Sequence, residues 1–189
     1  NSSAVSFSNC TVTFQSSFVL RTSTPAEDAD ETITGLLLED STGYIVYNTF
    51  ADNRGSKCSA LIMQGSEGIV VGNIFDDNWQ ASYESPMCLT RSSKEVGIFY
   101  NTFYDPIVVG SATPDLTWGY ALSISNATAS IHSNDYLIMS TRSALWISGS
   151  SNVTIQEDLG SVNTSSIAGL VLGGSNLKLS VSQLLLSGP

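Results

Sequence analysis

Short apolar stretches recur along the chain with polar links between them. One set comprises GLLLED from Gly35, ALIMQG from Ala60, MCLTRS from Met87, YALSIS from Tyr120, ALWISG from Ala144 and AGLVLG from Ala168. Polar links such as STG, SEG, SSK and SSN follow these stretches and are typical of turns. Next come segments such as ASIHS, NVTIQ and LKLSV, in which apolar and polar residues alternate. Alternation of period two, without sustained helical periodicity, predicts an all-β chain.

A seven-residue phrase appears three times, as YNTFADN from Tyr47, GNIFDDN from Gly72 and YNTFYDP from Tyr100. Its asparagines, Asn48, Asn73 and Asn101, are followed by Asn134 in a similar setting. Fainter copies place Gln15, Asp158 and Ser182 at the same position. The spacings between the seven positions are then 33, 25, 28, 33, 24 and 24 residues. Such spacings predict a repeat architecture.

Units of this length cannot bury their apolar faces alone, but stacked coils can. The pattern resembles the right-handed parallel β-helix of the pectin lyase-like superfamily over nearly the whole chain. We therefore expect a single domain, residues 1–189, that forms a right-handed parallel β-helix of about seven coils. A β-sandwich would require hairpin turns such as Asn-Gly or Asp-Gly, which the sequence lacks.

The repeated phrase predicts a structural ladder. An asparagine at one corner of every coil (Asn48, Asn73, Asn101 and Asn134) can bond its side-chain amide to the next coil. The aromatic residue two positions later in each copy is expected to stack in the core.

Acidic residues follow the phrase at a constant distance. Asp52, Asp77 and Asp105 stand four residues after three successive ladder positions. In register, neighbouring carboxylates about 4.8 Å apart would repel each other, and a hard cation such as Ca²⁺ would relieve this. The resemblance also implies a basic residue beside such a site, and Arg54 and Arg91 are the nearest by sequence. The alternative is a polar turn in water.

Other catalytic patterns of the resembled superfamily are missing, so no catalytic residue is predicted. The single histidine, His132, is out of phase with Ile131 and is expected to face solvent. The acidic run AEDADE at 26–31 is interpreted as a solvated loop, with adventitious Ca²⁺ binding as the alternative. No cofactor is expected apart from this possible calcium.

Three cysteines allow at most one internal disulfide. Cys58 and Cys88 begin comparable strands of adjacent coils, so a disulfide and free stacked thiols are both open. Cys10 is expected to pack inside the first coil.

The formal net charge of −10, with seven basic residues among 189, argues against a nucleic-acid partner. Apolar runs are too short to span a bilayer. The composition and five glycosylation sequons predict a secreted or cell-surface protein. The sequon asparagines are Asn1, Asn9, Asn126, Asn152 and Asn163.

Neither end of the sequence shows an obvious capping segment, so we expect a segment of a longer solenoid or a subunit that stacks end to end. Two functions follow. One is a non-catalytic structural module of a glycoprotein, such as a fibre, appendage or adhesin, whose loops bind carbohydrate. The other is a calcium-dependent polysaccharide lyase or hydrolase acting on an extracellular polysaccharide.

Overall fold

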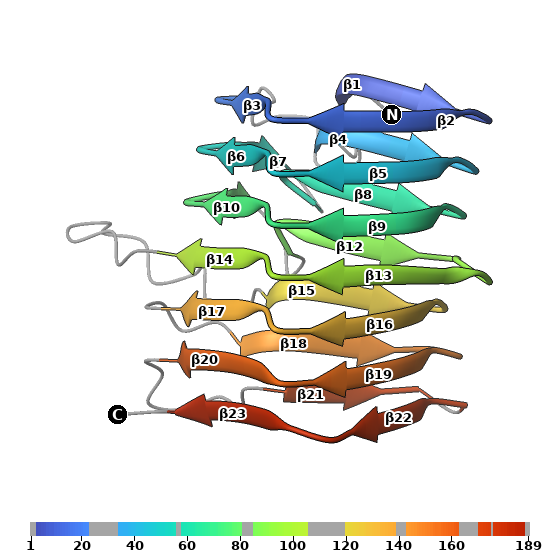
Figure 1. Ribbon diagram of the computed structural model, residues 1–189, viewed down its shortest axis with the longest axis vertical. Coiled ribbons are helices and arrows are strands. Elements are labelled where there is room, and N and C mark those ends of the chain that lie inside the picture. The colour runs from blue at the N-terminus through green and yellow to red at the C-terminus, as the bar shows by residue number, and fades with distance from the viewer. Residues whose placement is uncertain are drawn as a thin grey trace.

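A computed structural model describes residues 3–22, 34–55, 58–80, 85–105, 120–138, 143–162, 170–174 and 176–187. All regular elements in these segments are β-strands. They form three parallel sheets of seven strands each, and within each sheet the strands of successive coils stack along one long axis (Figure 1). The predicted all-β parallel solenoid is thereby confirmed. None of the described segments contains a helix long and apolar enough to cross a membrane.

Each coil contributes one strand to each sheet. Sheet A contains β1 (Ser3–Ser8), β4 (Thr34–Glu39), β8 (Leu61–Gln64), β12 (Met87–Thr90), β15 (Tyr120–Ser125), β18 (Ser143–Ser148) and β21 (Leu170–Gly173). Sheet B contains β2 (Thr11–Gln15), β5 (Thr42–Val46), β9 (Glu67–Val71), β13 (Glu95–Phe99), β16 (Thr128–His132), β19 (Asn152–Gln156) and β22 (Lys178–Val181). Sheet C contains β3 (Phe18–Leu20), β6 (Thr49–Ala51), β10 (Ile74–Asp76), β14 (Thr102–Asp105), β17 (Asp135–Ile138), β20 (Asp158–Val162) and β23 (Leu184–Ser187).

We call the turn from sheet A to sheet B the first corner, the turn from B to C the second corner, and the turn after sheet C the third corner. A small two-stranded sheet, β7 (Arg54–Gly55) with β11 (Trp79–Gln80), follows the third corner in two adjacent coils.

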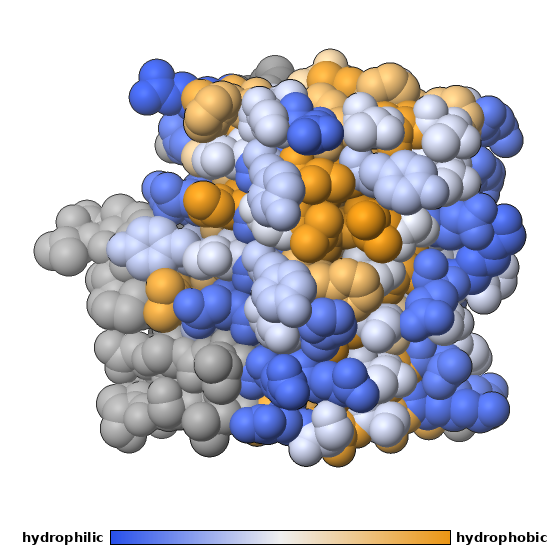
Figure 2. Space-filling view, in the orientation of Figure 1, coloured by the Kyte–Doolittle hydropathy of each residue, from blue (hydrophilic) through white to orange (hydrophobic). Residues whose placement is uncertain are grey.

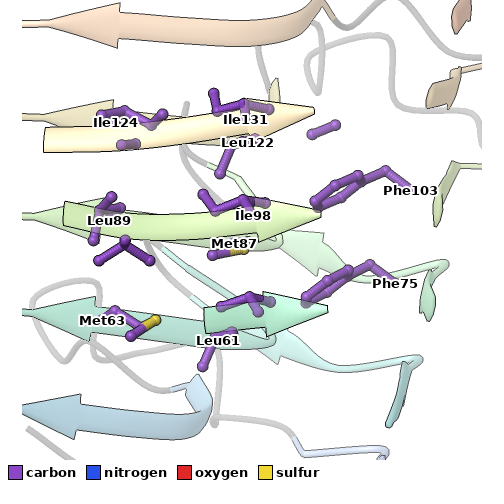
Figure 3. Close-up of a cluster of buried hydrophobic side chains, with 14 of the residues drawn as sticks. Leu61, Met63, Phe75, Met87, Leu89, Ile98, Phe103, Leu122, Ile124 and Ile131 are labelled. Atoms are coloured by element: carbon purple, nitrogen blue, oxygen red, sulfur yellow. The ribbon is translucent and has the colours of Figure 1, made fainter. Parts of the chain in front are cut away.

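The core forms because every second residue of a strand points inward and the same position recurs in the next coil. In sheet B, for example, Ile45, Val70, Ile98, Ile131 and Ile155 are paired in register and fully buried. Figure 3 shows such side chains of adjacent coils lying above one another.

Aromatic rings form a second interior column behind sheet C. The rings of Phe50, Phe75, Phe103 and Tyr136 are buried and nearly parallel, with successive centroids 5.0, 4.8 and 5.3 Å apart. This is the aromatic stack expected from the repeated phrase, and its spacing matches the distance of about 4.8 Å between neighbouring strands.

Asparagines link the coils at the second corner. Asn73 donates its backbone N–H (2.9 Å) and its side-chain Nδ2 (3.0 Å) to Oδ1 of Asn101, and Nδ2 also donates to the carbonyl of Ile45 in the preceding coil (2.8 Å). Asn48 and Asn134 make equivalent bonds. Both amide hydrogens and the amide oxygen are therefore used, as burial requires.

The ends of this ladder differ from the sequence prediction. In the first coil the backbone N–H of Ser17, and not of Gln15, donates to Asn48 Oδ1. In the last coil Leu184, and not Ser182, pairs with Asp158. The first- and last-coil assignments were thus wrong by two residues. Without an asparagine, the alternating pattern alone does not distinguish positions two residues apart, because both point to the same side.

Most described corners contain one residue in the left-handed conformation, and at many of them a buried Asn or Ser follows. At the second corner Tyr47, Gly72, Tyr100, Ser133 and Glu157 have φ between 54° and 66°. At the first corner Ser41 Oγ and Ser66 Oγ accept from the backbone N–H groups of Cys10 (3.2 Å) and Ser41 (3.1 Å). These serines belong to the polar links STG and SEG, which the sequence predicted only to be turns.

Candidate functional site

Hydrophobic and aromatic side chains gather on the solvent side of sheet B and along the second corner. Figure 2 shows this apolar patch over the middle of the sheet. We call it the aromatic face, and it comprises Tyr44, Val46, Tyr47, Ile69, Val71, Phe99, Tyr100 and His132. These residues share a surface because the outward positions of β5, β9, β13 and β16 lie in register.

Glycines make room for two of the rings. The Tyr47 ring occupies the space that a side chain at position 72 would fill, and the Phe99 ring does the same over Gly97. Phe99 also stacks on His132, with centroids 4.1 Å apart, and the Tyr100 ring meets His132 edge-on at 5.4 Å. The aromatic face is therefore held by contacts between adjacent coils.

His132 is half-buried within this face. The expectation that it points away from the core is correct, but its neighbours were not foreseen. Its partners are the aromatic rings of the preceding coil, and Nδ1 lies 3.4 Å from the Ser133 hydroxyl.

A charged pair borders the aromatic face at the first corner. Lys94 Nζ lies 2.8 Å from Glu67 Oε1, and the Thr42 hydroxyl donates to the same oxygen at 3.0 Å. The hydrogen bond from Lys94 and, next, that from Thr42 lower the pKa of Glu67. Glu67 therefore carries its negative charge at neutral pH, beside Ile69 of the same strand.

The aspartates predicted to bind a metal lie at the third corner. Asp52 and Asp77 are left-handed (φ 51° and 46°), and strand register places Asp105 in the same column. Arg21 occupies this column one coil earlier, and its Nε is 3.5 Å from Asp52 Oδ2. The left-handed conformation gives a local reason for aspartate here, since Asp tolerates it better than most residues. The side chain of Asp105 lies outside the described residues, so the three-carboxylate site stays a prediction.

The basic residues expected near this column lie elsewhere or are only partly described. Arg91 is left-handed and sits at the first corner, where its N–H donates to Ser125, so its assignment to the aspartate corner was wrong. The backbone of Arg54 belongs to β7, just beyond the third corner. Arg21, which was not predicted to lie at this corner, places a cation beside Asp52. Among the described side chains, no group of three His, Cys, Asp or Glu is placed to hold a metal.

A second asparagine ladder lies beside the aspartates and was missed from the sequence. Asn53 donates its N–H (3.2 Å) and Nδ2 (2.8 Å) to Asn78 Oδ1, and Asn78 Nδ2 donates to the carbonyl of Phe50 (2.8 Å). The signal was the last letter of the repeated phrase, which is Asn in the first two copies and Pro106 in the third. The phrase therefore encodes two successive corners.

Three of the five sequon asparagines are described, and all are exposed near the first corner. Asn9 and Asn126 are left-handed corner residues, and Asn152 is the first residue of β19. Asn1 and Asn163 lie outside the described residues, as does the acidic run at 26–31.

Cys58 and Cys88 form a disulfide across two adjacent coils. It packs with Ile62 and Leu37 on the outer side of sheet A, so the alternative of free thiols stacked in the core was wrong. Cys10 is a free, exposed thiol at the first corner, contrary to the expected interior position.

Comparisons with protein-family models, with curated proteins and with solved structures gave no match to this chain.

Proposed function

We propose that this chain is a non-catalytic structural module of a secreted or cell-surface glycoprotein, of the fibre, appendage or adhesin type, and that it binds carbohydrate. The observation that supports this most directly is the aromatic face. Tyr47 and Tyr100 are 65% and 62% exposed on this face, and the solenoid that carries them is stabilised by hydrogen-bonded asparagine ladders in its interior. Exposed tyrosines on a rigid support bind a ligand with little loss of conformational entropy. This face replaces the variable loops as the proposed binding surface.

An extracellular location is supported by the cysteine and sequon chemistry. Disulfides persist mainly in oxidising compartments, and the Cys58–Cys88 pair joins neighbouring coils. Glycans on Asn9, Asn126 or Asn152 would project from the first corner and leave the second corner uncovered, because the sheet B strands separate the two corners. Membership of the pectin lyase-like superfamily is part of this proposal, and three parallel sheets with polar corner ladders support it.

End-to-end self-association is the proposed structural role. The described sheets end in β1, β2 and β3 on one side and in β21, β22 and β23 on the other. Strands at the edge of a parallel sheet present backbone groups that a further coil can pair with. Neighbouring coils of a longer chain would pair with the same backbone groups.

The alternative, a calcium-dependent polysaccharide lyase or hydrolase, has one supporting observation. Backbone register places Asp52, Asp77 and Asp105 in a single column, which is the arrangement that calcium ligation would need.

One experiment separates the two functions. The protein is incubated with a panel of neutral and acidic polysaccharides in the presence of Ca²⁺ or a chelator, and both retention on the polysaccharide and release of reducing ends or unsaturated products are measured. We expect retention without product release, unchanged by the chelator. Product release that disappears with chelator and with Asp77→Asn would establish the enzyme instead, and failure to bind any polysaccharide would refute the binding role.

A further inference from the structure

Tyr47 and Tyr100 occupy the same position of the second corner, two coils apart, with Gly72 between them. The three N–H groups donate in turn to the carbonyls of Val71, Phe99 and His132, one coil further along. Since parallel strands lie about 4.8 Å apart, equivalent atoms of the two tyrosines are separated by about 10 Å along the solenoid axis. The outer edge of the aromatic face thus carries two exposed rings at a fixed interval.

From this spacing we infer that the aromatic face binds an extended, neutral β-1,4-linked polysaccharide that runs along the solenoid axis, with one sugar on each tyrosine. This inference rests on the proposed carbohydrate-binding function and names its ligand class. In the extended two-fold form of such a chain, every second sugar presents the same face, and the disaccharide repeat closely matches the spacing of the tyrosines. The C–H face of a pyranose ring packs on the electron-rich face of an aromatic ring.

The shape of the solenoid favours an extended ligand over a coiled one. Both tyrosines belong to the column of left-handed second-corner residues, in which each backbone N–H donates to the next coil in the same way, so the column follows the solenoid axis. An α-1,4-linked chain curves and would contact one tyrosine but not both. Gly72 has no side chain of its own, so the Tyr47 ring lies in the space above it.

Charge favours a neutral ligand. The aromatic face has no carboxylate or ammonium group of its own. On the same side of sheet B, Glu67 is paired with Lys94, and Glu95 is a further exposed acidic residue. The whole chain has a formal net charge of −10. The net charge of the chain, together with Glu95, would therefore disfavour an acidic polysaccharide.

The test uses isothermal titration of the whole protein with cellohexaose, with maltohexaose and oligogalacturonate as comparison ligands. Tyr47→Asn and Tyr100→Asn remove one ring each while keeping a residue that tolerates the left-handed conformation. All proteins are produced in a host without N-glycosylation, because each substitution creates an Asn-Asn-Thr sequon. We expect each substitution to weaken cellohexaose binding roughly tenfold, the effect of truncating a central aromatic anchor. Tyr104→Thr, which removes an exposed tyrosine from sheet C, is the matched control and should leave binding unchanged.

A second variant tests the spacing itself. Tyr47→Asn combined with Gly72→Tyr keeps two corner tyrosines but brings them to adjacent coils, about 5 Å apart. Position 72 can carry this side chain, because its φ of 66° is close to the 54° and 55° of Tyr47 and Tyr100, and Tyr47→Asn removes the ring that occupies the space beside it. We expect the double variant to bind cellohexaose no better than Tyr47→Asn alone. Circular dichroism and thermal unfolding establish that all variants remain folded.

The outcomes separate this inference from the proposed function. Binding of maltohexaose or oligogalacturonate in preference to cellohexaose would overturn the inference and leave a carbohydrate-binding module in place. Cellohexaose binding that is unchanged by either single substitution, or restored by Gly72→Tyr, would also overturn it. A protein that binds no saccharide would refute both. A dimer that dissociates on Tyr47→Asn would make a second copy the occupant of the face and overturn the inference.

Discussion

The hydroxyl of Tyr136 donates a hydrogen bond to Asp158 Oδ2 (3.1 Å) in the interior of the solenoid. Asp158 stands where the preceding four coils carry asparagine, and its Oδ1 accepts from the backbone N–H and Nδ2 of Asn134 (2.9 and 3.2 Å). The next coil places Leu184 opposite Asp158, and leucine offers no acceptor for a further ladder bond. A residue that only accepts is therefore well suited to end the ladder.

Asp158→Asn should remove a pH-dependent cost in stability. Burial raises the pKa of Asp158, so the folded state holds this proton more tightly than the unfolded chain. Stability is therefore unaffected by this group below its unfolded pKa of about 4, and falls as pH rises through the folded pKa. Asparagine keeps the Oδ1 acceptor and has no charge to bury. We expect the stability of the variant relative to the wild type to increase between about pH 4 and pH 7 in urea unfolding. A difference that stays constant over this range would contradict the prediction.

Asn101→Ala should be strongly destabilising, because it affects several buried partners at once. The N–H and Nδ2 groups of Asn73 lose their acceptor, and the carbonyl of Val70 loses its donor. With each unsatisfied buried group costing about 1–3 kcal/mol, we expect a loss of at least about 3 kcal/mol in the free energy of unfolding.

The matched control for this substitution is Asn152→Ala, at an exposed outward position of β19. It should change the free energy of unfolding by about 0.5 kcal/mol or less. Equal effects of the two substitutions in chemical denaturation would mean that the ladder bonds add nothing to stability.

The sequence predicted those parts of the fold that repeat with the same residue type. Asn48, Asn73 and Asn101 fixed the second corner, and the aromatic residue two positions later fixed the interior stack. Where the residue type changes, as at Ser17 and Leu184, the register could not be predicted from the sequence. Any residue except proline can offer its backbone N–H to the next coil, so the side chain at such a position gives no signal.

The aromatic face could not be predicted for a different reason. Its members come from four coils, and which of them meet depends on the register between strands up to 33 residues apart. The same limit explains the misplaced Arg91, because distance along the sequence does not indicate which corner a residue occupies. The ring over Gly72 comes from Tyr47 of the preceding coil and leaves no local pattern.

Removing the disulfide should weaken the solenoid without changing its fold. Cys58 and Cys88 are 30 residues apart, and closing a loop of this length in the unfolded chain corresponds to about 3–4 kcal/mol in the entropic account. We expect Cys88→Ser to lower the free energy of unfolding by about 2–4 kcal/mol. Reduction of the wild type should reproduce the effect, and Cys10→Ser, which removes the exposed thiol, should not. Insensitivity of the wild-type unfolding midpoint to reductant would argue against this stabilising role.

Two glycines of β9 and its following corner should respond differently to substitution. Gly68 has a φ of 124°, and a Cβ there would lie against the backbone carbonyl of Gly43 in the preceding coil. Gly68→Ala should therefore lower the free energy of unfolding by about 3 kcal/mol or more, because neither the backbone conformation nor the space admits a side chain.

Gly72 has a φ of 66°, and only the exposed Tyr47 ring occupies the space beside it. Gly72→Asn should cost about 1 kcal/mol or less, since Asn tolerates this conformation and the ring can move outward. Thermal or urea unfolding of the two variants measures the difference in the free energy of unfolding. A larger loss for Gly72→Asn than for Gly68→Ala would contradict the prediction and show that the Tyr47 ring, and not the backbone of the sheet, limits side-chain size at this edge.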